Sequence, residues 1–164
     1  MIRGMSPSTP DGEAITADGL EVLRAELEDL ETGGRQAMAE RINAARQLGD
    51  LKENAEYHIA KDEQAHLETR IRRLRQRLRN AVVVEADPSG GTVAFGRTAE
   101  VVDEESGRVH TWTIVGPTEA DLAEGKLSAE SPVARALLGR APGDAVAVET
   151  PRGTRNYRVE RLIP

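Results

Sequence analysis

The amino-acid sequence predicts an α+β protein in which a long antiparallel coiled-coil hairpin precedes a small sheet domain. Apolar residues recur at helical spacing as far as residue 78, and short β-rich runs follow residue 80. The chain of 164 residues is 30% charged and only 2% aromatic, which suits long solvated helices better than one large aromatic core. We expect a disordered tail over residues 1–14, the hairpin over 15–80 and the sheet domain over 81–164.

The composition excludes several classes of site and of location. The chain has no cysteine, which excludes disulfides, thiolate metal sites and thiol nucleophiles. Its net charge of −6 argues against bulk electrostatic binding of duplex nucleic acid, so any nucleic-acid contact would have to be local. No apolar stretch approaches the roughly 18 residues of a membrane span, and the N-terminus carries no signal pattern. We therefore expect a cytoplasmic protein that makes no membrane contact.

Two apolar stripes predict the two arms of the hairpin. The first arm begins after Thr16, a candidate N-cap. Its stripe is Leu20, Leu23, Leu27 and Leu30, and the second stripe is Tyr57, Ala60, Gln64, Leu67, Ile71, Leu74 and Leu78. Antiparallel pairing joins Leu23 to Leu78, Leu27 to Leu74 and Leu30 to Ile71, residue numbers that add up to 101 in each case. The chain should therefore reverse near the bond between Asp50 and Leu51.

The same pairing rule makes further predictions along the hairpin. It brings a small residue opposite a larger one in the pairs Gly34–Leu67, Ala37–Gln64 and Ala44–Tyr57, whereas Arg41–Ala60 fits less well. Six acids at the start of the first arm also face six arginines at the end of the second. We interpret the arginines as a solvated face matched by these acids, in preference to a nucleic-acid site. The Gly33–Gly34 pair predicts a weak point or bend.

Residues after 80 predict a small antiparallel sheet with one packed helix. The expected strands are 82–85, 92–95, 98–102, 109–115, 144–149 and 154–163. Turns are expected at 105–107 and 151–153. Ser131 followed by Pro132 predicts the N-cap of a short helix that runs to Leu138 and ends at Gly139.

Two carboxylates stand at the predicted reversal, where residues 49–57 form the tip of the hairpin. Asp50 and Glu53 are three residues apart, and this spacing by itself favours a capping box at the start of the second helix. Two exposed carboxylates alone would hold Mg²⁺ poorly, because that ion requires octahedral oxygen coordination. Offered to a metal site that another protein has half built, the same pair could complete the coordination and orient a water for phosphodiester attack. The cap and the metal role can coexist.

Two separate runs of sequence resemble one known family. The first run is residues 49–57, at the reversal of a long helical hairpin, and the second is residues 131–140 followed by Gly143 and Asp144. Both runs are similar to signatures of the bacterial transcript-cleavage factors of the GreA/GreB family, closest to its GreA branch. The resemblance covers roughly residues 15 to 163. It implies an FKBP-like fold for the C-terminal domain.

The resemblance also implies a function at a partner's active site. Such a factor inserts its coiled coil into the secondary channel of bacterial RNA polymerase, and the polymerase then hydrolyses its own backtracked transcript. Asp50 and Glu53 would hold a second Mg²⁺ jointly with the polymerase, so the isolated protein would bind none and would be no enzyme by itself. We expect it to act as a monomer.

Four further tip residues receive roles from the same resemblance. Asn54 and Tyr57 would shape the tip. Arg46 and Lys61 match basic positions that the family uses near the 3′ end of the nascent RNA, and Lys61 stands where arginine is usual. A lysine offers charge there without the bidentate fork of arginine. Ordinary solvated charges remain the alternative for both basic residues.

Other functions stay open on the sequence alone. A Gre-like inhibitor would block the channel without cleavage, and a coiled-coil scaffold would use Asp50 and Glu53 only as a cap. Prolyl isomerase activity is the least favoured, because core packing explains Phe95, Trp112 and Tyr157, the only aromatic residues after residue 80. The three histidines, His58, His66 and His110, show no metal-ligand spacing.

Overall fold

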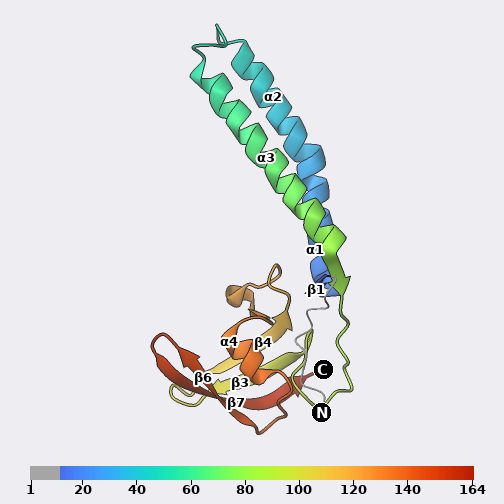
Figure 1. Ribbon diagram of the computed structural model, residues 1–164, viewed down its shortest axis with the longest axis vertical. Coiled ribbons are helices and arrows are strands. Elements are labelled where there is room, and N and C mark those ends of the chain that lie inside the picture. The colour runs from blue at the N-terminus through green and yellow to red at the C-terminus, as the bar shows by residue number, and fades with distance from the viewer. Residues whose placement is uncertain (1–11) are drawn as a thin grey trace. The chain divides into compact units, whose positions relative to one another are not determined.

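The computed structural model describes residues 12–164 and divides them into two compact units (Figure 1). One unit is the helical hairpin, Leu20–Asn80. The other contains Ala81–Pro164 together with residues 12–19. Both the α+β class and the hairpin followed by a sheet are as the sequence predicts. Among residues 12–164, no helix combines the length and the apolar character needed to cross a membrane.

The predicted tail is wrong where it can be compared with the structure. Residues 1–11 of that tail lie outside the described residues, but Glu13 and Ala14 belong to strand β1 (Glu13–Ile15). This strand pairs in parallel with β2 (Ala81–Val83), with Ala14 opposite Val82. Ala14 and Ile15 are buried. A strand of three residues whose partner lies far along the chain leaves no local pattern in the sequence.

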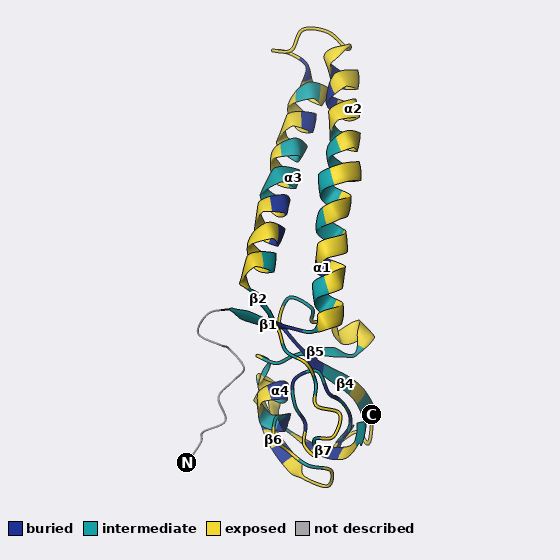
Figure 2. Ribbon diagram, turned by 90° about the vertical axis from the view of Figure 1, so that its right-hand side faces the viewer, coloured by how far each residue is buried: buried dark blue, intermediate teal, exposed yellow. Residues whose placement is uncertain are grey.

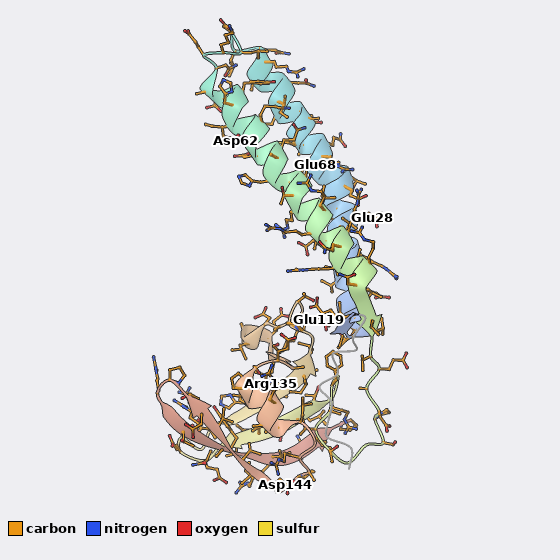
Figure 3. The ribbon with its side chains drawn as sticks, in the orientation of Figure 1. Glu28, Asp62, Glu68, Glu119, Arg135 and Asp144 are labelled. Carbon is orange, nitrogen blue, oxygen red and sulfur yellow. The ribbon has the colours of Figure 1, made fainter. Side chains whose placement is uncertain are left out.

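A carboxylate holds the segment that leads into the first helix. Thr16 caps α1 (Ala17–Asp29), as predicted, because its hydroxyl accepts a bond from the Gly19 amide at 3.0 Å. Glu119 accepts bonds from the amides of Thr16 and Gly116, both at 3.0 Å, and from the Thr16 hydroxyl (Figure 3). A Cβ at Gly19 would collide with this carboxylate. Glycine at that position therefore lets Glu119 approach the start of α1.

The first arm of the hairpin contains a π-helical turn. After α1 the turn spans Leu30–Gly34, and α2 (Arg35–Arg46) continues the arm. The weak point predicted at Gly33–Gly34 takes this form. A Cβ on Gly34 would lie 3.5 Å from the Leu67 side chain, which agrees with the predicted pairing of these two residues.

The π turn corrects the pairing predicted beyond it. Each π turn adds one residue to the helical repeat, so every later position moves by one. Ile42 and Ala45 are accordingly buried, whereas Arg41 and Ala44, which the sequence rule placed in the seam, are exposed. Ala37 is exposed for the same reason.

The second arm is a single uninterrupted helix, α3 (Ala55–Asn80). Its buried residues, Ala60, Ile71 and Leu74, all belong to the predicted stripe, and Figure 2 shows the buried positions recurring along one side of the helix. Small and aliphatic side chains thus form a narrow seam between two highly charged surfaces. Burial of this seam is the main source of stability for the hairpin.

Ion pairs between the arms follow the predicted charge pattern only in part. Arg70 pairs with Glu26, and Arg75 pairs with Glu31 at 3.0 Å. Nearer the tip, Arg35 pairs with Glu68 at 2.9 Å, and Arg41 pairs with Glu63. Within residues 12–164, only two of the six arginines near the end of α3 are thus matched by acids of the first arm.

Besides the β1–β2 pair, the second unit contains a curled five-stranded sheet in the order β5-β4-β3-β7-β6. Its strands are β3 (Thr98–Asp103), β4 (Val109–Val115), β5 (Lys126–Ser128), β6 (Ala145–Thr150) and β7 (Gly153–Ile163). The sheet is mixed, because β4 and β5 are parallel, whereas the sequence predicts an antiparallel sheet without β5. Helix α4 (Pro132–Leu137) is capped by Ser131, whose hydroxyl accepts the Ala134 amide at 3.2 Å, as predicted.

One predicted strand is a loop. In residues 92–95, Val93 and Phe95 are buried in alternation, which explains the β-like pattern. Their segment bonds to the chain after α4 instead of to the sheet: the Val93 amide donates to the carbonyl of Arg140 at 2.8 Å, and the Gly139 amide donates to Val93 at 2.8 Å.

Core packing accounts for the three aromatic residues of this unit. Phe95 and Tyr157 are buried in the core, and Trp112 packs against it. The Trp112 ring makes an edge contact with Tyr157 at 5.7 Å between centroids and stacks on His110 at 4.6 Å. The interpretation of these rings as core residues is confirmed.

Asp103 fixes the turn between β3 and β4 and should make the sheet unit sensitive to acid. The residue is 2% exposed, and its carboxylate accepts the amides of Glu105 at 2.9 Å and Ser106 at 3.3 Å and the guanidinium of Arg155 at 3.0 Å. Burial by itself raises the pKa of Asp103, but these bonds and the Arg155 charge outweigh it and hold the pKa below its usual 3.8.

We expect Asp103→Asn to reduce the acid sensitivity of this unit. Because the pKa is lowered by folding, the carboxylate stabilises the folded state above pH 3.8 and loses this effect as the pH falls through the folded pKa. The variant should melt at a lower temperature than wild type near neutral pH, and the difference should narrow in acid. Melting curves between about pH 7 and pH 2 would measure it. A difference in melting temperature between the two proteins that does not change with pH would contradict this role.

Candidate functional site at the hairpin tip

The chain reverses in the connection between α2 and α3, residues 47–54, as the pairing rule predicts. The last turn of α2 closes with amide bonds from Gln47 to Ala44 at 3.3 Å and from Leu48 to Ala45 at 3.1 Å. Gly49 follows with φ of +136°, a conformation that side chains other than glycine rarely adopt. This glycine lets the chain leave α2 sharply and places Asp50 in the middle of the reversal.

Asn54 organises the tip by bonding to both arms. Its side-chain carbonyl accepts the Tyr57 amide at 3.1 Å, and its backbone carbonyl accepts the His58 amide at 3.2 Å, so Asn54 is the N-cap of α3. Its side-chain amide donates to the Ala45 carbonyl at the end of α2. Asn54 is only 9% exposed. One side chain therefore joins the end of the first arm to the start of the second.

The capping box predicted for Asp50 and Glu53 is therefore wrong. Asn54 occupies the N-cap, one residue beyond the predicted pair, and neither carboxylate accepts an amide of α3. The sequence contained the signal for this, because asparagine is a favoured N-cap and stands directly before the helix. The pattern Asp-x-x-Glu matches a capping box and therefore predicted the cap at the wrong residue.

Both tip carboxylates are exposed and nearly free of internal partners. Asp50 accepts one bond through its side chain, from the Lys52 amide at 3.1 Å, and its backbone carbonyl accepts the Glu53 amide at 3.2 Å. The Glu53 carboxylate has no hydrogen bond or ion pair with any residue of 12–164. Its oxygens, and one oxygen of Asp50, are thus available to an external ligand.

The basic and aromatic residues of the tip form a small cluster on the two arms. The guanidinium of Arg46 lies over the Tyr57 ring, 5.8 Å from its centroid. Tyr57 makes an edge contact with His58 at 5.7 Å, and the His58 ring lies 3.3 Å from the Lys52 carbonyl. The first turn of α3 thus anchors Arg46 beside the reversal.

Lys61 lies one turn further along α3. Its amine donates to Gln64 at 3.0 Å, and both Arg46 and Lys61 are exposed. The structure thus joins Asn54, Tyr57 and Arg46 by direct contacts, whereas Asp50 and Glu53 share only the same reversal of the chain with them and Lys61 contacts Gln64.

The tip has the donor chemistry of a hard cation but not a complete site. Carboxylate oxygens are the side-chain ligands that Mg²⁺ prefers, and Asp50 and Glu53 supply two such groups. Within residues 12–164, no three or more His, Asp or Glu side chains come together in a group that could hold a metal. The residues fit the role of completing a metal site that a partner provides.

Comparison with known proteins matches both units of this chain. Residues 13–83 match the family model described as "Transcription elongation factor, N-terminal", and residues 87–163 match "Transcription elongation factor, GreA/GreB, C-term". The transcription elongation factor GreA of Thioalkalivibrio sulfidiphilus is 44% identical over 147 residues, 88% of this chain and 93% of that protein. GreA of Roseiflexus sp. is 51% identical over 142 residues, 85% of this chain and 90% of that protein.

Solved structures are similar over nearly the whole chain. The GreA factor homolog 1 (Gfh1) of Thermus thermophilus is 30% identical, with a TM-score of 0.41 and coverage of 93% of this chain and 99% of that one. The GreA/GreB elongation factor of Nitrosomonas europaea is 22% identical, with a TM-score of 0.41 and coverage of 93% and 98%. On the family models and the identity to its relatives, this chain belongs to the GreA/GreB family of transcription elongation factors.

Proposed function

We propose that this protein enters the secondary channel of bacterial RNA polymerase with its hairpin and stimulates the polymerase to cleave backtracked nascent RNA. One observation carries the proposal. Asp50 and Glu53 stand at the reversal of the hairpin with their carboxylates exposed, while Asn54 alone caps the helix that follows. Neither acid caps the helix, and within residues 12–164 only one of their four carboxylate oxygens accepts a hydrogen bond, which leaves the others for a partner.

The length of the hairpin suits delivery of these acids into a narrow cavity. Helix α3 has 26 residues and is therefore about 39 Å long at 1.5 Å per residue. Its seam consists of small and aliphatic residues such as Ala60 and Ile71, which keeps the two arms close together. A thin, stiff rod of this length can reach a buried active centre while its other end stays outside.

Each tip residue then has a role that follows from its contacts. Asp50 and Glu53 would hold Mg²⁺ jointly with the acids of the polymerase, and the bound ion supplies Lewis-acid activation of the attacking water. Asn54 keeps the two acids at a fixed place by joining the arms. Arg46, held by Tyr57, and Lys61 offer positive charge to the phosphates of the RNA 3′ end. The hydrolysis remains that of the polymerase.

A cleavage assay on stalled complexes tests this function. Backtracked elongation complexes with labelled RNA are incubated with Mg²⁺, with and without the full-length protein. We expect the RNA to shorten from its 3′ end only when the protein is present, and free RNA mixed with the protein alone to stay intact. RNA that keeps its length while synthesis slows would show a channel-blocking inhibitor instead. Failure to associate with polymerase in a pull-down would reduce the protein to a coiled-coil scaffold.

Arg46 should affect RNA engagement more than chemistry. We expect Arg46→Gln to raise the protein concentration needed for half-maximal cleavage about two- to tenfold, because one charge-assisted contact to phosphate is lost. The effect should be larger at low salt, where exposed charges are less screened. Arg79→Gln, the same change at an exposed position near the other end of α3, is the matched control. An equal effect of the two substitutions would reduce Arg46 to an ordinary surface charge.

A further inference from the structure

A hollow on the surface of the hairpin is lined mainly by basic residues of α3. It measures about 510 Å³, and its polar lining is Glu26, His66, Thr69, Arg70, Arg73 and Arg77. The basic members follow at intervals of three or four residues, which places them on one side of the helix. We call these four side chains, His66, Arg70, Arg73 and Arg77, the basic groove.

Most of the positive charge in the basic groove is not neutralised by the residues that the structure describes, 12–164. Arg70 pairs with Glu26, the only acid among the described residues that line the hollow. Arg73 and Arg77 have no hydrogen bond or ion pair with any residue in 12–164, although the sequence predicts acids opposite them. Three arginines and one glutamate leave a net charge of +2 in a chain whose total is −6. This positive cluster is therefore available to an external anion.

We propose that the basic groove binds a compact anion that carries several linked phosphates. Guanidinium groups bind phosphate oxygens bidentately, and His66 adds a further donor at the end of the row. The volume lies within the range of small-molecule sites. The shared chemistry is an oligophosphate chain, either a free inorganic one or the phosphate chain of a nucleotide.

The basic groove is distinct from the tip and does not rest on its proposed role. The basic groove begins at His66, five positions after Lys61, and Arg73 follows Lys61 by 12 positions along α3, which corresponds to about 18 Å. An RNA 3′ end held by Arg46 and Lys61 therefore does not reach Arg73 by the same contact. A failed cleavage assay would leave the binding experiment on this groove unaffected.

Isothermal titration calorimetry of the full-length protein with sodium tripolyphosphate tests the proposal. We expect saturable binding of one tripolyphosphate per chain. The double variant Arg73→Ala, Arg77→Ala should weaken it at least about tenfold, because two charge-assisted contacts are lost. The double variant Arg24→Ala, Arg79→Ala removes the same charge from exposed positions of the hairpin outside the hollow and should change the affinity less than about threefold.

A gain of affinity provides a test that misfolding cannot imitate. Glu26→Gln removes the one acid of the hollow and releases Arg70, so it should tighten tripolyphosphate binding by about 1.5- to fivefold. Helix content by circular dichroism should stay the same for all variants, since the replaced side chains are exposed or partly exposed.

The remaining outcomes decide between sources and against the proposal. Equal affinities for tripolyphosphate and ATP would show that the groove recognises the phosphate chain alone. Tighter binding of ATP would show that the groove also contacts the nucleoside. Equal losses in the two double variants would show unspecific attraction and overturn the proposal. Tighter binding of a single-stranded RNA nonamer than of tripolyphosphate would also overturn it, in favour of a nucleic-acid strand as the ligand.

Discussion

Replacing Asp50 with asparagine, or Glu53 with glutamine, is expected to lower the rate of RNA cleavage in backtracked complexes by about 100-fold. An amide keeps the shape of the carboxylate but loses the charge that a hard cation requires. The melting temperature should not change, because both side chains are exposed and neither caps α3. Single-turnover cleavage at saturating protein, together with thermal melting, would measure both quantities.

A neighbouring acid provides the control for this prediction. Glu56 is exposed in the first turn of α3, and it has no hydrogen bond or ion pair within residues 12–164. Glu56→Gln should therefore retain the wild-type cleavage rate. Full cleavage by Asp50→Asn and Glu53→Gln, or a loss that only follows a lowered melting temperature, would contradict the roles assigned to the two acids.

Removing the Asn54 side chain is expected to damage both the stability and the activity of the tip. Asn54→Ala loses the cap of α3 and removes one of the two donors to the Ala45 carbonyl, which keeps the Leu48 amide, and these losses should destabilise the hairpin by about 1–3 kcal/mol. Cleavage should fall as well, because Asp50 and Glu53 then belong to a reversal that no longer joins the arms. Thermal melting and the cleavage rate are the two readouts.

A second substitution at the same position separates the two bonds of Asn54. Asn54→Asp keeps an oxygen that can accept the Tyr57 amide, but it cannot donate to the Ala45 carbonyl. We expect it to recover helix stability and to recover cleavage only in part. Complete recovery of both would show that the cap suffices and that the bond to Ala45 has no part in positioning the acids.

The sequence predicts most of the hairpin because its determinants are local. The spacing of the leucines defines the arms, and the constant sum of the residue numbers in each pair predicts a reversal close to Asp50. The prediction fails by one residue after the π turn, where Ile42 replaces Arg41 in the seam. Two adjacent glycines predict a weak point in the helix. Whether the chain forms an α or a π turn there depends on packing against Leu67, and a local sequence pattern does not contain that information.

The sheet unit is predicted less completely because its missing parts depend on distant partners. Strands β1 and β5 have three residues each, and each pairs in parallel with a segment that the sequence does not place beside it. The loop at Val93 has the alternation of a strand but bonds to Arg140. At the tip, the resemblance supplied the candidate residues, and the structure shows that Asn54 and not Asp50 is the cap of α3.

The most direct test of the central claim is a Mg²⁺ titration of cleavage by wild type and by Glu53→Gln on the same backtracked complexes. If the tip acids complete a metal site, the half-maximal Mg²⁺ concentration should rise by about tenfold or more in the variant, with cleavage recovering as Mg²⁺ increases. An unchanged half-maximal concentration with a lower maximal rate would contradict the claim, because Glu53 would then act without binding the ion.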